Sequence, residues 1–105
     1  MALQHLSALE ASILISCVRV ASESDLFPDW EFHTLFGLTR SEVALVASQG
    51  TNADDRTQDV VTAINNSVVN LLGYPHGRID WVHEAVGANE AEIMRVYKKW
   101  KSPLG

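Results

Sequence analysis

The chain contains one short motif twice, and this repetition constrains the fold more than any other feature of the sequence. The motif reads Phe-Gly-Leu-Thr-Arg-Ser-Glu-Val at 36–43 and Val-Gly-Ala-Asn-Glu-Ala-Glu-Ile at 86–93. In each copy the glycine can end a helix by adopting the left-handed conformation. Thr39 or Asn89 can then cap the following helix, and a glutamate three positions further on can complete a capping box. Each copy therefore predicts a helix, a tight turn and a second helix.

The likeness between the copies extends upstream of the turn. The pair Asp29-Trp30 recurs as Asp80-Trp81, a shift of 80 − 29 = 51 residues, whereas His33 recurs as His83, a shift of 83 − 33 = 50 residues. One residue is therefore extra in the first copy. A fixed period combined with shared chemistry favours a duplicated unit. The alternative is that two unrelated helical hairpins use the same turn residues.

The apolar pattern predicts helices throughout the chain and no strand. Apolar residues recur every three or four positions in the long segments, and no stretch alternates convincingly with a period of two. The four main helices are expected at 3–22, 39–48, 55–72 and 89–101. Two short helices, capped by Asp29 and Asp80, connect them. The expected fold is all-α, a small bundle of four main helices plus two short helices in one domain, 1–105, with similar helical-hairpin halves at about 3–49 and 54–102.

The first long helix is apolar on most of its surface. A helix of this kind is buried on most sides. It is therefore either the central helix of the bundle or a contact between two copies of the chain. We interpret it as a homodimer contact with Leu14, Ile15 and Val18 as the candidate dimer face, and central burial is the alternative.

Charge and composition restrict the possible partners. The 105 residues carry a formal net charge of −5, with 47% hydrophobic and 20% charged residues, as in ordinary globular proteins. A net negative charge argues against general affinity for nucleic acid or for an anionic membrane. The apolar run at 11–20 is too short to span a bilayer. Cys17 is the single cysteine, so no intramolecular disulfide can form, and a cytoplasmic location is expected.

Aromatic and histidine side chains stand near the turns and loops of both halves. They are Trp30, His33, Tyr74, His76, Trp81 and His83. Tryptophans next to helix caps most often pack against the core or its rim. If the two halves face each other, the same side chains can line a shared groove, and we take them as the candidate groove for a partner or ligand.

No sequence pattern assigns catalysis or a cofactor. His33 and His83 could approach each other and hold a metal ion, but a metal site needs three or four ligands, and no recognised ligand spacing is present. Cys17 lies in the most apolar segment with no base beside it, so it is not expected to act as a nucleophile. No metal site, cofactor or enzymatic activity is therefore predicted.

A helix-turn-helix is another possible interpretation, because 30–48 has the gross shape of that motif. The helix that would enter the major groove has Arg40 as its one basic residue, whereas DNA binding requires several cations. The sequence favours a small soluble protein-interaction or regulatory module, homodimeric and with an unknown protein partner. A helix-turn-helix-like nucleic-acid-binding protein and a metal- or small-ligand-binding helical protein are the alternatives.

Overall fold

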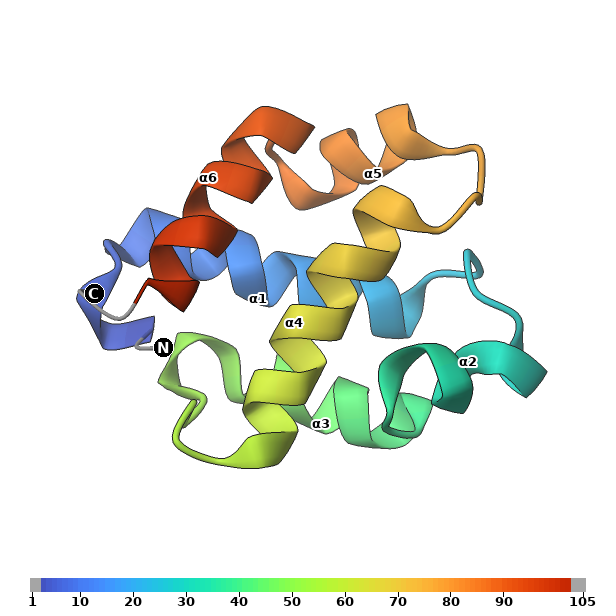
Figure 1. Ribbon diagram of the computed structural model, residues 1–105, viewed down its shortest axis with the longest axis horizontal. Helices are drawn as coiled ribbons and strands as arrows, with labels where there is room; N and C mark the ends of the chain where they lie inside the picture. Colours follow the sequence, from blue (N-terminus) through green and yellow to red (C-terminus); the bar gives the residue numbers. More distant parts are fainter. Residues whose placement is uncertain (1–2, 103–105) are drawn as a thin grey trace.

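The computed structural model describes residues 3–102, which form helices and no strand (Figure 1). The α-helices are α1 (Ala8–Glu23), α2 (Asp29–Phe36), α3 (Arg40–Gln49), α4 (Gln58–Gly73), α5 (Ile79–Val86) and α6 (Glu90–Lys101), and two short 3-10 helices are η1 (Leu3–His5) and η2 (Gly50–Asn52). These helices pack as one bundle, and the predicted all-α class is confirmed. None of the described helices has the length and hydropathy needed to cross a membrane.

Helix α1 is the central helix of the bundle. It packs against α3, α4, α5 and α6, and α4 crosses in front of it in Figure 1. Leu14, Ile15 and Val18 are therefore buried inside a single chain, with 0%, 6% and 0% of their surface exposed. This corrects the expectation of a dimer face at these residues. The helix is apolar on most sides because other helices of the same chain cover it.

The turn between α2 and α3 has the predicted chemistry. Gly37 ends α2 with φ of 70°, in the left-handed region where a side chain is strained. Thr39 then forms a complete capping box: the Glu42 N–H donates to Thr39 Oγ1 at 3.1 Å, and the Thr39 N–H donates to Glu42 Oε1 at 2.8 Å. This part of the motif is confirmed.

The turn between α5 and α6 repeats this geometry with a simpler cap. Gly87 ends α5 with φ of 84°, and Asn89 Oδ1 accepts from the Glu92 N–H at 2.8 Å. Unlike Glu42, the Glu92 carboxylate does not complete a capping box. The helix starts also recur at a constant shift: 58 − 8, 79 − 29 and 90 − 40 all equal 50 residues.

The surroundings of the two turns nevertheless differ. A Cβ added at Gly37 would lie 3.6 Å from Thr62 Cγ2 on α4, whereas one added at Gly87 would meet nothing within 4 Å. Two asparagines of α4 explain the close approach, because Asn66 Nδ2 donates to the Phe36 carbonyl at 2.7 Å and Asn70 Nδ2 donates to the Leu35 carbonyl at 3.0 Å. These bonds satisfy two backbone acceptors at the end of α2. The two halves thus share the spacing of their helix starts but not their packing, and α3, with 10 residues, is shorter than α6, with 12.

A carboxylate joins the start of α1 to α6. Glu10 forms a capping box with Ser7, whose N–H donates to Glu10 Oε1 at 2.9 Å. It also accepts from Arg95 Nη1 at 3.1 Å and from Lys99 Nζ at 3.0 Å. The Ser7 N–H, Lys99 and Arg95 lower the pKa of Glu10 to about 2. The predicted start of the first helix at residue 3 is wrong, because Ser7 is the N-cap of α1 and Leu3–His5 form the separate helix η1.

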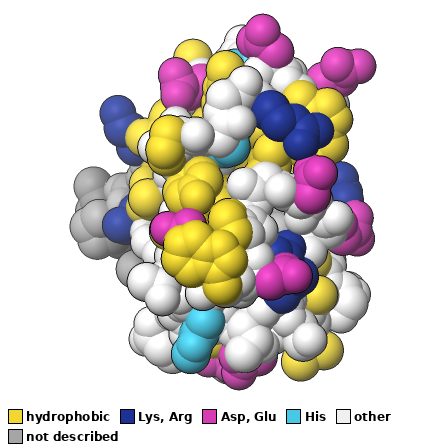
Figure 2. Space-filling view, turned by 90° about the vertical axis from the view of Figure 1, so that its right-hand side faces the viewer, with side chains coloured by type: hydrophobic (Ala, Val, Ile, Leu, Met, Phe, Trp, Pro, Cys, Tyr) yellow, Lys and Arg dark blue, Asp and Glu magenta, His cyan; other side chains and the backbone are white. Residues whose placement is uncertain are grey.

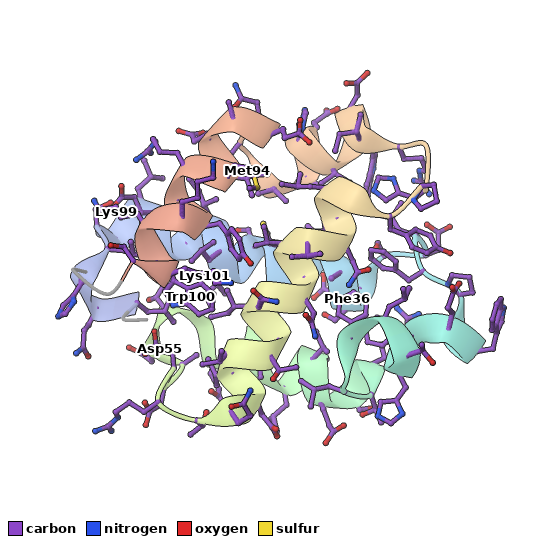
Figure 3. The ribbon with its side chains drawn as sticks, in the orientation of Figure 1. Phe36, Asp55, Met94, Lys99, Trp100 and Lys101 are labelled. Atoms are coloured by element: carbon purple, nitrogen blue, oxygen red, sulfur yellow. The ribbon has the colours of Figure 1, made fainter. Side chains whose placement is uncertain are left out.

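A second carboxylate joins three parts of the chain at the same end of the bundle. Asp55 Oδ2 accepts from the Leu3 N–H at 2.7 Å and from Trp100 Nε1 at 2.9 Å. Figure 3 shows the Asp55 and Trp100 side chains turned toward each other. Trp100 is buried. The third long helix is predicted to begin at residue 55, but Asp55 lies before α4, which begins at Gln58. Asp55 therefore anchors the chain start and α6 together.

Candidate functional site

Two loops and the first turn of α2 lie at the end of the bundle away from Leu3 and Trp100 (Figure 1, Figure 3), and we call this surface the loop end. The loops are 24–28, between α1 and α2, and 74–78, between α4 and α5, at the right of Figure 1. The ring of Phe27 lies 5.3 Å from that of Tyr74, centroid to centroid. Arg78 Nη1 pairs with Asp25 Oδ1 at 2.8 Å. A ring contact and an ion pair therefore fix the two loops to each other.

Buried phenylalanines support the loop end from below. Phe32 and Phe36 stack with their ring centroids 4.1 Å apart, and Phe27 meets Phe36 edge to face at 5.1 Å. All three side chains are buried. Aromatic pairs in these geometries contribute more than their buried area alone, about 1 kcal/mol each. These buried aromatic contacts therefore stabilise the loop end.

Arg40 holds the first loop in place. Its guanidinium donates to the carbonyls of Ser22, Ser24 and Phe27 at 3.3, 3.2 and 2.9 Å, and to Asp29 Oδ1 at 2.8 Å. It also lies 4.3 Å from the centroid of the Phe32 ring. In the helix-turn-helix interpretation, Arg40 is the one basic residue of the helix that would enter the major groove. Its side chain is instead engaged within the chain, because the loop carbonyls have no helical partner.

Tyr74 and His76 are fixed by hydrogen bonds. Tyr74 Oη donates to Glu31 Oε2 at 2.9 Å, and this bond is the main reason that the pKa of Tyr74 is raised. His76 Nε2 lies 2.7 Å from the Leu71 carbonyl, and its Nδ1 accepts from the Arg78 N–H at 3.0 Å. Because a carbonyl can only accept, Nε2 carries the proton and the ring is neutral in this arrangement. Both rings therefore belong to the framework of the loop end.

Trp30 and Trp81 differ in exposure because their helices begin at different points. Trp30 is the second residue of α2, whereas Trp81 is the third residue of α5, and one position corresponds to about 100° around a helix. Trp30 is 83% exposed and Trp81 is 39% exposed. The predicted caps Asp29 and Asp80 are wrong for the same reason, since the N-cap positions are Pro28 and Arg78.

The two tryptophans do not face each other across one groove. Trp81 lines a shallow depression of about 290 Å³ between α1 and α5, whose other lining residues are Arg19, Val20, Glu23, Ser24 and Ala85. Arg78 covers its ring with Cζ 4.9 Å from the centroid. The side chain of Trp30 makes no hydrogen bond or ring contact within the described residues. Figure 2 views this end, where hydrophobic side chains occupy the middle of the face and charged ones surround them.

His33 and His83, which the sequence suggested could approach each other, are not part of a metal-ligand set within residues 3–102. His33 is exposed on α2. His83 is half-buried on α5, and its Nε2 is buried with no hydrogen-bond partner among the described residues. Within residues 3–102, no three His, Cys, Asp or Glu side chains are placed to hold a metal ion. Burial raises the pKa of Cys17 to about 12, so this thiol stays protonated.

Of the six candidate groove residues, the structure therefore links Tyr74, His76 and Trp81 through the loops and leaves Trp30 as an exposed neighbour on α2. Asp25, Glu31 and Arg78 are not predicted from the sequence: Asp25 and Arg78 join the two loops, and Glu31 joins α2 to the 74–78 loop. No local sequence pattern predicts these contacts, because Asp25 and Arg78 are 53 residues apart and Glu31 and Tyr74 are 43 residues apart. The chain matches no protein-family model, and no curated protein and no solved structure is significantly similar to it.

Proposed function

We propose that this protein is a small cytoplasmic protein-interaction module and that the loop end is its partner-binding surface. The observation that carries the proposal is Trp30, an indole that is 83% exposed on a well-supported surface. Tryptophan is among the residues most enriched at binding hot spots. An exposed indole that makes no hydrogen bond or ring contact within residues 3–102 is available to a partner at little cost in rearrangement.

The rigidity of the loop end also supports this function. Arg40 fixes the first loop, the Asp25–Arg78 pair joins that loop to the second, and the Glu31–Tyr74 bond joins α2 to the second loop. A surface that is already ordered loses less conformational entropy when a partner binds. No catalytic role is assigned. The helix-turn-helix alternative finds no support in this geometry, because the guanidinium of Arg40 is occupied by loop carbonyls.

A photo-crosslinking experiment tests the proposal. A photoreactive amino acid replaces exposed His33, one turn along α2 from Trp30, and captured proteins are identified and purified. The affinity of a purified partner is then measured by calorimetry with Trp30→Ala and with the matched control Leu45→Ala, a side chain that is 63% exposed on α3. We expect Trp30→Ala to weaken binding about 30-fold, as at a hot spot of about 2 kcal/mol, and the control to leave it unchanged. Equal losses of affinity in the two variants would show that the loop end is not the partner-binding surface.

A further inference from the structure

We propose that the loop end binds an arginine-rich segment of its partner protein, with a guanidinium stacked on Trp30. The proposal rests on the proposed function, because it assigns the partner chemistry of the same surface. Indole is the best side-chain acceptor for a cation over its ring face. The chain already contains one such contact at this end, where Arg78 covers the ring of Trp81 at 4.9 Å. Within residues 3–102, no cation lies over the Trp30 ring.

The carboxylates on either side of Trp30 are held in place and keep acceptor capacity. Asp29 binds Arg40 through Oδ1, and its side chain is 93% exposed. Glu31 binds Tyr74 through Oε2. The second oxygen of each carboxylate is not used in these bonds. An arriving guanidinium could therefore stack on the indole and donate to a neighbouring carboxylate, a combination that suits the planar, multi-donor arginine better than lysine.

The charge of the surrounding surface favours a basic partner. Residues 23–33 and 74–84 contain one basic residue, Arg78, and six acidic residues: Glu23, Asp25, Asp29, Glu31, Asp80 and Glu84. Arg40 of α3, which pairs with Asp29, and Arg19 of α1, which lines the depression beside Trp81, add two basic residues to this surface, so acidic residues still outnumber basic ones there. Of these carboxylates, Glu23, Asp80 and Glu84 form no hydrogen bond or ion pair within residues 3–102. Opposite charges on two surfaces raise the rate of association and exclude acidic partners.

The basic residues of the chain concentrate at the other end of the bundle. Half of the eight Lys and Arg residues lie on α6, as Arg95, Lys98, Lys99 and Lys101. Figure 3 shows Lys99 and Lys101 far from the loop end, along the 36 Å axis of the molecule. This separation of charge orients an approaching basic segment toward Trp30.

A peptide titration tests the inference with probes of defined composition. Fluorescein-labelled peptides that alternate glycine with arginine, lysine or glutamate are titrated with the intact chain, and fluorescence anisotropy gives the affinity. We expect the arginine peptide to bind more tightly than the lysine peptide of equal charge, and the glutamate peptide not to bind. Trp30→Ala, which changes no charge, should weaken the arginine peptide about threefold to fivefold, the effect of a cation–π contact at an exposed site.

A matched pair of double variants separates this site from general attraction to an acidic protein. Asp29→Asn/Glu31→Gln removes two charges beside Trp30, and Asp59→Asn/Glu90→Gln removes two exposed charges on α4 and α6. Circular dichroism verifies that each variant is folded. The first pair should weaken binding of the arginine peptide more than the second. Equal losses, or an affinity that Trp30→Ala leaves unchanged, would overturn the inference.

The two proposals fail in different ways. If Trp30→Ala leaves the affinity for the arginine peptide unchanged but weakens binding of the cross-linked partner, the proposed partner chemistry is wrong and the proposed binding surface is retained. If neither ligand depends on Trp30, both proposals are wrong.

Discussion

At the scale of single residues, two charged side chains, Arg40 and Glu10, each hold several parts of the chain together. Arg40 donates to the Ser22 carbonyl at the end of α1 and to the Ser24 and Phe27 carbonyls of the 24–28 loop, and it pairs with Asp29. Loop carbonyls have no helical partner, so removing their donor leaves acceptors that are satisfied only by water. Glu10 plays the same kind of role at the other end, where it serves a helix cap and two cations on α6.

Replacing Arg40 with Met should destabilise the protein by about 2 kcal/mol, because hydrogen bonds to a charged group contribute about 1.5–3 kcal/mol. The free energy of unfolding is measured by urea denaturation. Arg56→Met is the control, since Arg56 is exposed and pairs with Asp54 two residues away in sequence. The control should change stability by less than about 0.5 kcal/mol. Similar losses in the two variants would show that Arg40 does not hold the loop.

The lowered pKa of Glu10 predicts how stability depends on pH. Its folded pKa of about 2 lies below the usual value for glutamate, about 4.3, so folding favours the ionised form. The stabilisation is complete above the unfolded pKa and is lost as the pH falls from about 5 toward 2. Glu10→Gln keeps the shape of the cap and removes the charge. Its deficit relative to wild type should therefore shrink over this range, measured by urea denaturation at each pH; a constant deficit would contradict the account.

At the scale of elements, the capped turns could be predicted from the sequence, whereas the first residues of the short helices could not. The Gly37–Thr39 turn could be predicted because every group that forms it lies within a few residues. The starts of α2 and α5 could not, since the repeated Asp-Trp pairs suggested the same register in both helices. The structure shifts them by one position, which exposes Trp30 more than Trp81. Burial of α1 was also ambiguous, because the same apolar surface suits a dimer contact and a central helix.

Substitution in α1 distinguishes those two possibilities. Ile15→Glu places a charge on α1 at a position that is 6% exposed, inside a helix that packs against four other α-helices. We therefore expect the free energy of unfolding to fall by about 4 kcal/mol or more, with extensive unfolding. Leu45→Glu, at an exposed site on α3, should remain folded. Circular dichroism and light scattering report the outcome. A folded Ile15→Glu protein with half the mass of the wild type would support the dimer face instead.

The two turn glycines provide a second test at this scale. Both have positive φ, so Gly37→Ala and Gly87→Ala should each cost about 1–2 kcal/mol. The contacts of an added Cβ at Gly37 are of ordinary van der Waals length, 3.6 Å or more, and should add little. Thermal or urea denaturation of both variants measures the difference. A far larger loss for Gly37→Ala would mean that α4 presses more tightly on this turn than the structure shows.

At the scale of the whole molecule, long-range pairs decide how the helices assemble. Glu10 with Lys99 and Asp55 with Trp100 join positions 89 and 45 residues apart. Each partner alone looks like an ordinary polar or capping residue, so periodicity predicted the helices without predicting these contacts. The origin of the two halves by duplication stays a prediction: helix starts recur at a shift of 50 residues, while the packing around Gly37 and Gly87 differs.

The arrangement also separates two tasks between the ends of the bundle. The Asp55 and Glu10 contacts anchor α6 and the described start of the chain at one end, and the two loops form a supported surface at the other. Homodimerisation remains a prediction that light scattering can test, and it would require a surface other than Leu14, Ile15 and Val18.

The indole signals of the three tryptophans test the central claim most directly. Trp100 serves as an internal control, because it is buried and donates to Asp55 at 2.9 Å. The purified partner is titrated into ¹⁵N-labelled protein, and the indole N–H signals are assigned with single Trp→Phe variants. We predict that the Trp30 signal shifts as the partner binds while the Trp100 signal stays in place. A partner that binds without moving the Trp30 signal would contradict the account.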